Sequence, residues 1–376
     1  MRAQTYLDYN ATAKVRPEAS AAALAAMAQA GNPSSVHADG RAARALIEDA
    51  RAEVAGLVGA RAGAVTFVSG GTEANALGIK SAVAAGFERL IVGATEHEAV
   101  ARAAQAAGLA VETWPVNGDG LADLDWLEAR LAAGGPVLVC LMLANNETGV
   151  IQPVATAAAM VRGSGGWLHV DAVQAAGKIA VDFNALGAHT LALSAHKLGG
   201  PQGAGALVAA SDASLTPSLR GGGQERGLRA GTENTPGIAS FGAAARAAVR
   251  DLAEITGQAE WRDALAASAT AFGATVLGAG APRLPQTLCF ATPGFSSEVQ
   301  VMALDLEGVM VSAGAACSSG KVTPSGSASA MGRPDLARFA VRVSGGWASS
   351  RADWRRCGEV WCEAFDRAVA RRREVA

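Results

Sequence analysis

Hydrophobic and polar positions along residues 15–255 alternate between two patterns, one typical of strands and one typical of helices. Short apolar runs of strand length lie at residues 65–69, 90–92, 137–143, 167–171, 191–194 and 204–209. Alanine-rich stretches of helical character lie at residues 73–85, 99–107, 124–133 and 154–162. Strands that alternate with helices in this way predict βαβ units, and therefore a mainly parallel α/β sheet with helices on both faces.

The pattern changes after a long helix that we expect to begin near Pro236. Beyond about residue 265 the strands are more widely separated, residues 312–330 are rich in glycine and serine, and a closing helix is predicted over residues 353–371. With 376 residues, the chain is longer than a single core usually becomes. We therefore predict two domains, a large one over residues 15–255 and a smaller α+β one made of residues 1–14 and 256–376.

Composition and charge argue against several classes of protein. The 32 basic and 34 acidic residues give a formal net charge of −2, which offers no electrostatic basis for binding nucleic acid or a membrane. No apolar run approaches the ~18 residues of a membrane-spanning helix, and the first residues lack the apolar core of a signal peptide, so we expect a cytoplasmic protein. The five cysteines include no C-x-x-C pair, which argues against a disulfide framework and an intrinsic metal site.

Two polar residues at strand ends carry the strongest chemical signal. Asp171 ends the apolar run at 167–171, and Lys197 follows the run at 191–194. The ends of such strands form the crevice in which open α/β sheets bind ligands. A lysine that forms a Schiff base with an aldehyde, and a carboxylate that keeps a pyridine nitrogen protonated, are the groups that a pyridoxal phosphate site requires. We therefore expect pyridoxal 5'-phosphate as the cofactor.

Other polar residues follow predicted strands. Gly71 and Thr72 belong to a double-glycine turn that leads into a helix, which suits either an anion site or a plain helix cap. His97 lies where an imidazole could stack on a cofactor ring or serve a purely structural purpose. Asn145 and Asn146 are two consecutive asparagines that could form a turn, or supply an amide that hydrogen-bonds the phenolic oxygen of the cofactor.

Three further segments are candidates for substrate chemistry. The glycine-rich loop at 221–234 contains arginines and Thr232, which suit either anion recognition or a basic surface. Cys317 lies among small residues at 312–320, which predicts a mobile segment and a thiol that can act as a nucleophile. Arg342 is a single charge in an apolar strand, and its partner is either a substrate carboxylate or a structural ion-pair partner.

Together these motifs resemble the cysteine desulfurases, which are fold type I pyridoxal phosphate enzymes of the class V aminotransferase group. The likeness runs nearly from end to end of the chain. Its motifs are residues 6–12, 31–37, 69–75 and 145–149, the segments around Asp171 and Lys197, the glycine-rich loop and the Cys317 loop. The fold that the resemblance implies is the fold type I PLP-transferase, with a mainly parallel sheet in a large domain beside a smaller α+β domain.

The resemblance also implies a role for each candidate residue. Lys197 is the Schiff-base lysine, and Asp171 contacts the pyridine nitrogen. The other cofactor contacts that it implies are Asn146 and Gln174 at the phenolic oxygen, His97 stacked on the ring, and Gly71, Thr72, Ser194, His196 and Thr232 at the phosphate, Thr232 coming from the other subunit of a homodimer. The substrate contacts that it implies are Arg342 at the carboxylate, Asn32 beside it, and Cys317 as the nucleophile.

The implied reaction removes sulfur from L-cysteine, releases L-alanine and leaves a persulfide on Cys317. The sequence Ala-Cys-Ser-Ser-Gly resembles the long-loop group of the family, which passes sulfur to an acceptor for iron–sulfur cluster assembly. In that group Cys317 would be a transient iron–sulfur ligand shared with a scaffold protein. Two alternatives stay open, a selenocysteine lyase and another class V aminotransferase-type enzyme, although an aminotransferase needs no thiol.

Two departures from the family pattern lie near the expected site. Gly326 and Ser327 stand where the family usually has a histidine and an aliphatic residue. Gly345 and Gly346 follow Ser344 where the family usually has Ser-Leu-Gly. Because glycine gives the backbone more freedom, we expect these changes to loosen the loop and the strand beside the site.

Overall fold

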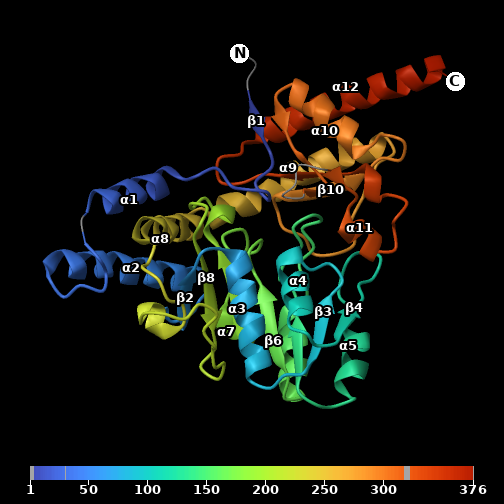
Figure 1. The fold of residues 1–376 in the computed structure, drawn as a ribbon. Coiled ribbons are helices and arrows are strands. Elements are labelled where there is room, and N and C mark those ends of the chain that lie inside the picture. The colour runs from blue at the N-terminus through green and yellow to red at the C-terminus, as the bar shows by residue number, and fades with distance from the viewer. Residues whose placement is uncertain (1–3, 30, 317–321, 376) are drawn as a thin grey trace.

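The computed structural model describes residues 4–29, 31–316 and 322–375, so Cys317 lies outside the described residues. Its centre is a seven-stranded sheet (Figure 1). In spatial order its strands are β2 (Val65–Val68), β8 (Gly205–Ala209), β7 (Thr190–Ser194), β6 (Trp167–Asp171), β5 (Val137–Cys140), β3 (Arg89–Gly93) and β4 (Val111–Trp114). Strands β7, β6, β5, β3 and β4 run parallel, whereas β8 is antiparallel to both neighbours. The expected mainly parallel sheet is confirmed, with one reversed strand.

Helices cover both faces of this sheet, because successive residues of a strand point to opposite sides. Ile91 and Val139 belong to the core cluster on one face, and Leu90 and Leu138 belong to the cluster on the other. The helices of the first face are α2 (Ala38–Leu57), α5 (Leu124–Leu131), α6 (Val154–Gly163), α7 (Phe183–Leu186) and α8 (Thr235–Arg250). Those of the second face are α3 (Gly71–Ala84) and α4 (Glu98–Ala106), and α1 (Pro17–Ala28) packs on α8.

A smaller antiparallel sheet is built from the later part of the chain (Figure 1). Its strands, in spatial order, are β12 (Ser312–Ala313), β15 (Ala340–Ser344), β10 (Thr287–Ala291) and β9 (Thr275–Val276). The two-stranded pairs are β1 (Thr5–Tyr6) with β11 (Val309–Met310), and β13 (Ala315–Ala316) with β14 (Val322–Thr323). The helices of this part are α9 (Leu252–Ala271), α10 (Ser297–Leu306), α11 (Gly326–Ala330) and α12 (Arg351–Val375). The short 3-10 helices of the chain are η1 (Ala62–Ala64), η2 (Ala195–Lys197), η3 (Gln224–Gly227) and η4 (Ala337–Phe339).

The core of this second part joins the two ends of the chain. Leu7 is buried in the same cluster as Leu288 and Trp354. The ring of Trp361 lies 5.1 Å from that of Phe290, edge to face. This packing supports the predicted assignment of the N-terminal residues to the smaller domain, although the boundaries stay a prediction. Within the described ranges, no helix is both long enough and apolar enough to cross a membrane.

Candidate active site

Asp171 and Lys197 lie at the same edge of the large sheet. Asp171 is the last residue of β6, and Lys197 is the last residue of η2, which directly follows β7. Strands β6 and β7 are parallel neighbours, so both residues are at the carboxyl edge, where such sheets bind ligands. The two are close enough for the charge of Asp171 to act on the pKa of Lys197. The structure thus brings together the pair on which the cofactor prediction depends.

Asp171 is fixed by a chain of buried hydrogen bonds. Its carboxylate accepts from the Val173 N–H at 2.9 Å and from the Asn75 amide at 2.8 Å. Asn75 Oδ1 lies 2.9 Å from His169 Nε2, and His169 Nδ1 lies 2.9 Å from the Thr190 hydroxyl. Burial lowers the pKa of His169 to about 3, so its imidazole is neutral and donates through one nitrogen only. Because Asn75 turns its carbonyl to His169, that donor is Nε2.

Lys197 is held as a reactive amine. Its Nζ donates to the backbone carbonyls of Asn10 at 2.6 Å and Ala11 at 2.8 Å. Burial, together with the positive charge of Arg342, lowers the pKa of Lys197 to about 8, against the opposing effects of Asp8 and Asp171. Since only the neutral amine attacks an aldehyde, this shift favours the chemistry expected of the residue.

The segment at residues 8–13 forms one wall of the site, and sequence reasoning assigned no role to any residue in it. Asn10 is buried, and its amide donates to the Asn146 carbonyl at 3.1 Å and to the Thr287 hydroxyl at 3.0 Å. Its own carbonyl accepts from Lys197 and, at 2.9 Å, from the Gln174 side chain. The polar residues that follow the short apolar strand near the N-terminus were the signal that could have identified this wall.

The turn between β2 and α3 has the form of an anion cradle. Helix α3 begins at Gly71, and its N-cap residue, Gly70, supplies no capping side chain, so the first-turn N–H groups remain available. A Cβ atom at Gly71 would lie 2.9 Å from Val173 Cγ2 and 3.5 Å from Ser194 Cβ. Glycine therefore lets this turn approach the buried Ser194, while the exposed Thr72 adds a hydroxyl at the rim.

His196 lies beside this cradle as a neutral imidazole. Burial, together with the positive charges of Lys197 and Lys178, lowers the pKa of His196 to about 4. Its Nδ1 lies 3.2 Å from the Thr12 hydroxyl, which leaves Nε2 for another partner. An anion cradle, a reactive amine and a fixed carboxylate on one sheet edge fit the phosphate, the aldehyde and the pyridine nitrogen of pyridoxal phosphate.

Arg342 forms the ion pair that sequence analysis named as its alternative. Its Nη2 lies 2.7 Å from Asp8 Oδ1, and its Nη1 donates to the Asn146 carbonyl at 3.1 Å. The guanidinium is nevertheless not saturated, because its buried Nε has no hydrogen-bond partner among the described residues. A substrate carboxylate at Arg342 would therefore share the guanidinium with Asp8.

The two consecutive asparagines have different surroundings. Asn145 forms the turn, because its Oδ1 accepts from the N–H groups of Glu147 at 3.0 Å and Thr148 at 2.8 Å. Asn146 contributes its backbone carbonyl to Asn10 and Arg342, and its predicted contact with the cofactor stays a prediction. His97 is exposed and caps α4, with Nδ1 accepting from the Ala99 N–H at 3.1 Å.

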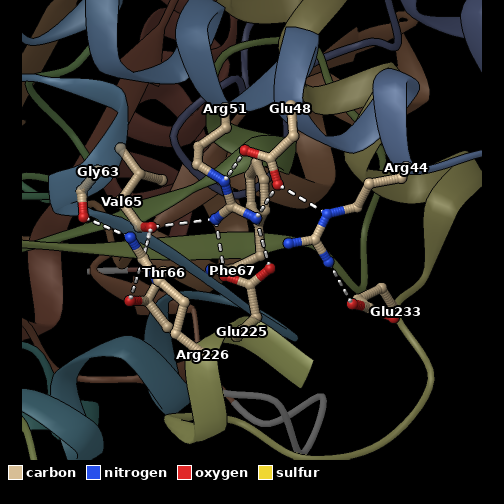
Figure 2. A network of polar contacts seen from close by, with 10 residues as sticks. All are labelled: Arg44, Glu48, Arg51, Gly63, Val65, Thr66, Phe67, Glu225, Arg226 and Glu233. Atoms are coloured by element: carbon tan, nitrogen blue, oxygen red, sulfur yellow. Dashed lines mark hydrogen bonds and ion pairs between the residues drawn. The ribbon is translucent and has the colours of Figure 1, made fainter. Parts of the chain in front are cut away.

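The glycine-rich loop is tied to the large sheet by its charged residues, so its arginines serve the chain itself (Figure 2). Glu225 accepts from Arg51 in two bonds of 2.7 Å. Arg226 donates to the Gly63 and Val65 carbonyls, and Arg229 pairs with Glu73 at 3.0 Å. Glu225 and Arg226 have φ angles of 46° and 60°, values that residues other than glycine rarely adopt.

Thr232 and Asn32 lie at exposed positions of a single chain. Thr232 is exposed a few residues beyond the tethered part of the glycine-rich loop. Asn32 lies between α1 and α2, where its Oδ1 accepts from the Ser34 N–H at 2.8 Å. Among the contacts of the described residues, none joins Asn32 to Arg342. The roles of Thr232 and Asn32 therefore stay predictions.

The residues at the departures from the family pattern are closely packed, and whether these changes loosen the backbone stays a prediction. The Ser327 hydroxyl lies 3.0 Å from Glu147 Oε1 and 3.2 Å from Asn145 Oδ1, and Ser325 donates to the same carboxylate at 2.5 Å. A Cβ atom at Gly345 would lie 2.3 Å from Gln258 Oε1, and one at Gly346 would lie 1.9 Å from the Tyr9 ring. These glycines allow close packing, and the serine anchors α11.

Comparisons with known proteins agree with this geometry. The sequence pattern of the aminotransferase class-V family matches residues 5–354. A cysteine desulfurase of Frankia sp. (strain EuIK1) is 42% identical, and the match covers 96% of this chain and 90% of that protein. A NifS-like protein from Rickettsia africae ESF-5 has a TM-score of 0.89 at 31% identity, covering 97% of this chain and 100% of that chain. The structure of SspA in complex with cysteine has a TM-score of 0.76 at 26% identity, covering 90% and 98%.

The family match spans most of the chain, and the fold and the curated relative agree with it. The chain therefore belongs to the class V aminotransferase family and, within it, to the cysteine desulfurases, which are enzymes that use pyridoxal phosphate.

Proposed function

We propose that this cysteine desulfurase takes L-cysteine as its substrate, releases L-alanine and retains the sulfur as a persulfide on Cys317. The observation that carries the proposal is the buried Lys197, with a pKa of about 8, on the same sheet edge as Asp171, which Asn75 and Val173 hold in place. The structure of SspA with cysteine supports the choice of substrate. When bound, pyridoxal phosphate supplies an electron sink for the reacting carbon.

The residues of this chain have distinct tasks in the proposed reaction. Lys197 attaches the cofactor and moves protons at the substrate, and Asp171 keeps the pyridine nitrogen protonated.

The other proposed contacts hold the cofactor in place. The phosphate lies in the cradle of Gly71, Thr72, Ser194 and His196. Asn146 and Gln174 face the phenolic oxygen, and His97 stacks on the ring. Arg342 holds the substrate carboxylate beside Asp8, near Asn32.

In the proposed sulfur transfer Cys317 accepts the sulfur, and the atoms and electrons balance. Its thiolate attacks the substrate sulfur, so that an S–S bond forms while the C–S bond breaks and its electron pair stays with the carbon. A proton then completes the methyl group of L-alanine. The products are L-alanine and a Cys317 persulfide, and no external oxidant or reductant is required.

The destination of the sulfur rests on the resemblance. The sequence around Cys317 resembles the long-loop group of cysteine desulfurases, and one relative at 36% identity is named cysteine desulfurase IscS. We propose that a scaffold or other acceptor protein for iron–sulfur cluster assembly receives the persulfide, in the cytoplasm. The exposed Thr232 supports a homodimer in which it completes the phosphate site of the other subunit.

Product analysis with two variants tests the proposal. The purified holoenzyme with L-cysteine should form L-alanine, and mass spectrometry without reductant should find added sulfur on the peptide that contains Cys317. Cys317→Ser should still bind the cofactor yet form little alanine, and Lys197→Ala should form none. Wild-type alanine production by Cys317→Ser, or added sulfur on Cys357 or Cys362 instead, would contradict the assignment.

A further inference from the structure

We infer that Lys178 is a positioning residue of the cofactor site, and that its side-chain nitrogen sets the orientation of the Asn10 and Gln174 amides. Through this contact Gln174 is made to present an N–H group, rather than its carbonyl, to the phenolic oxygen of the cofactor. The inference rests on the proposed function, because it concerns the same site. It assigns a task to a buried lysine that the proposed reaction does not otherwise use.

Lys178 lies in the interior, close behind the predicted cofactor contacts. Its side chain is buried, and its Nζ donates to Gln174 Oε1 at 2.5 Å and to Asn10 Oδ1 at 3.1 Å. Gln174 precedes it by four residues, so the two side chains come from one short segment after β6. Within the part of the chain that the structure describes, no carboxylate forms an ion pair with Lys178. Its partners are two amide oxygens.

The chemistry of the donor decides how these amides are turned. The Lys178 Nζ carries at least two N–H donors whether or not it is charged, and it donates them to Asn10 Oδ1 and Gln174 Oε1, so both amides face it with oxygen. The amide nitrogens of Asn10 and Gln174 consequently point away from Lys178. That of Asn10 donates to the Asn146 carbonyl and to Thr287, and that of Gln174 donates to the Asn10 carbonyl. One side chain therefore orders both amides.

The second N–H of the Gln174 amide is the one that matters for the cofactor. An amide nitrogen carries two donors, and the Asn10 carbonyl takes one of them. The other remains for the phenolic oxygen that Gln174 is proposed to face. If the amide were flipped, its carbonyl would repel that oxygen instead.

The electrostatic surroundings of Lys178 indicate that this lysine does more than fill space. Burial lowers the pKa of Lys178 well below its usual value, and the positive charges of Lys197 and Arg342 lower it further. The charged groups that act on Lys197 are Arg342, Asp8 and Asp171. A lysine surrounded in this way is a costly choice for filling space, because an apolar side chain of the same length would avoid the desolvation.

The test is a pH titration of the visible absorbance of the holoenzyme, compared between wild type and Lys178→Met. An N–H donor to the phenolic oxygen stabilises the anionic form of that oxygen. Losing the donor therefore raises the pKa of the proton that the phenolic oxygen shares with Lys197 Nζ. The pH midpoint of the absorbance change should therefore rise by about half a unit or more. Cofactor binding, measured by equilibrium dialysis, should become several-fold weaker. Lys80→Met removes an exposed lysine and should match wild type in both measurements.

A second pair of variants separates positioning from packing and keeps the test informative if Lys178→Met folds poorly. Gln174→Met should raise the midpoint in the same direction, and the double variant Lys178→Met/Gln174→Met should show no further rise. The double variant replaces both polar partners by apolar groups, which limits the cost to folding.

Two results would overturn the inference. One is a wild-type midpoint in folded Lys178→Met, and the other is an equal additional rise when Lys178→Met is added to Gln174→Met, which would show an effect independent of Gln174. Neither result would touch the proposed function, whose failure would appear as a wild-type holoenzyme that forms no alanine from L-cysteine.

Discussion

Two buried polar clusters in this chain differ in the partners of their positively charged side chains. In the cluster that ties the glycine-rich loop to the sheet, Arg51 and Glu225 form two bonds of 2.7 Å, and Glu225 also accepts from the Phe67 N–H at 2.8 Å (Figure 2). In the cofactor cluster, Lys178 and Lys197 donate to amide and carbonyl oxygens instead of carboxylates. The first cluster is internally neutralised, and the second keeps an excess of donors.

The pKa values follow this difference. Burial by itself would lower the pKa of Arg51, but its bonds to Glu225 and Glu48 raise it above the usual range. The pKa of Lys197 is lowered to about 8, because burial and the charge of Arg342 outweigh the opposing charges of Asp8 and Asp171. A buried lysine whose pKa is lowered in this way more readily supplies the neutral amine that reacts with the cofactor aldehyde.

Removing Glu225 should produce the largest effect on stability. Glu225→Ala leaves Arg51 buried with only the half-exposed Glu48 as an acidic partner, and breaking a buried pair in this way typically costs about 3–5 kcal/mol. Denaturant unfolding followed by circular dichroism measures this loss. The matched control is Glu98→Ala, which removes an exposed helix pair with Arg102 and should cost less than about 1 kcal/mol. Equal losses in the two variants would show that the Arg51 cluster is not a structural anchor.

Arg342 should matter for substrate binding more than for folding. Arg342→Ala removes a guanidinium that contacts the substrate carboxylate before and during the reaction, so KM for L-cysteine should rise by about 30-fold or more, with kcat less affected. Steady-state alanine formation measures both constants. Asp8→Asn keeps the shape of the ion-pair partner and removes its charge, and it should lower KM if Asp8 competes with the substrate. An unchanged KM in Arg342→Ala would show that Arg342 serves only as the ion-pair partner of Asp8.

The lowered pKa of Lys197 predicts the pH dependence of cofactor capture. Only the neutral amine reacts, so the rate at which the apoprotein binds pyridoxal phosphate should fall about tenfold per pH unit below pH 8 and level off above it. An ordinary lysine would level off only near pH 10.4. Stopped-flow absorbance after mixing measures the rate. A rate that keeps rising to pH 10 would mean that Lys197 is not perturbed as the structure indicates.

The sequence predicts well those site residues that lie directly after buried strands. Asp171 and Lys197 belong to this class, because a polar residue at the end of an apolar run marks the sheet edge. Asn75 and Asn10 do not, since their roles come from partners far away in the chain, such as His169 for Asn75 and Gln174 for Asn10. Lys178 had a local signal in its four-residue spacing from Gln174, but burial of a lysine cannot be seen from sequence.

The prediction of the fold from sequence has the same limit as the prediction of the site. The buried strands β5, β6 and β7 coincide with apolar runs, whereas β4 at the sheet edge contains polar residues and half-exposed positions and was not predicted. The ion pair of Arg342 with Asp8 joins opposite ends of the chain, so sequence analysis could name an ion pair as an alternative but not its partner.

The most direct test of the account is to find which of the two buried lysines holds the cofactor. The holoenzyme is reduced with borohydride, digested, and its peptides are mapped by mass spectrometry. The account predicts that the added mass of the cofactor lies on Lys197 and that Lys178 remains unmodified. Cofactor on Lys178, or no covalent cofactor on either lysine, would contradict the assignment of the site.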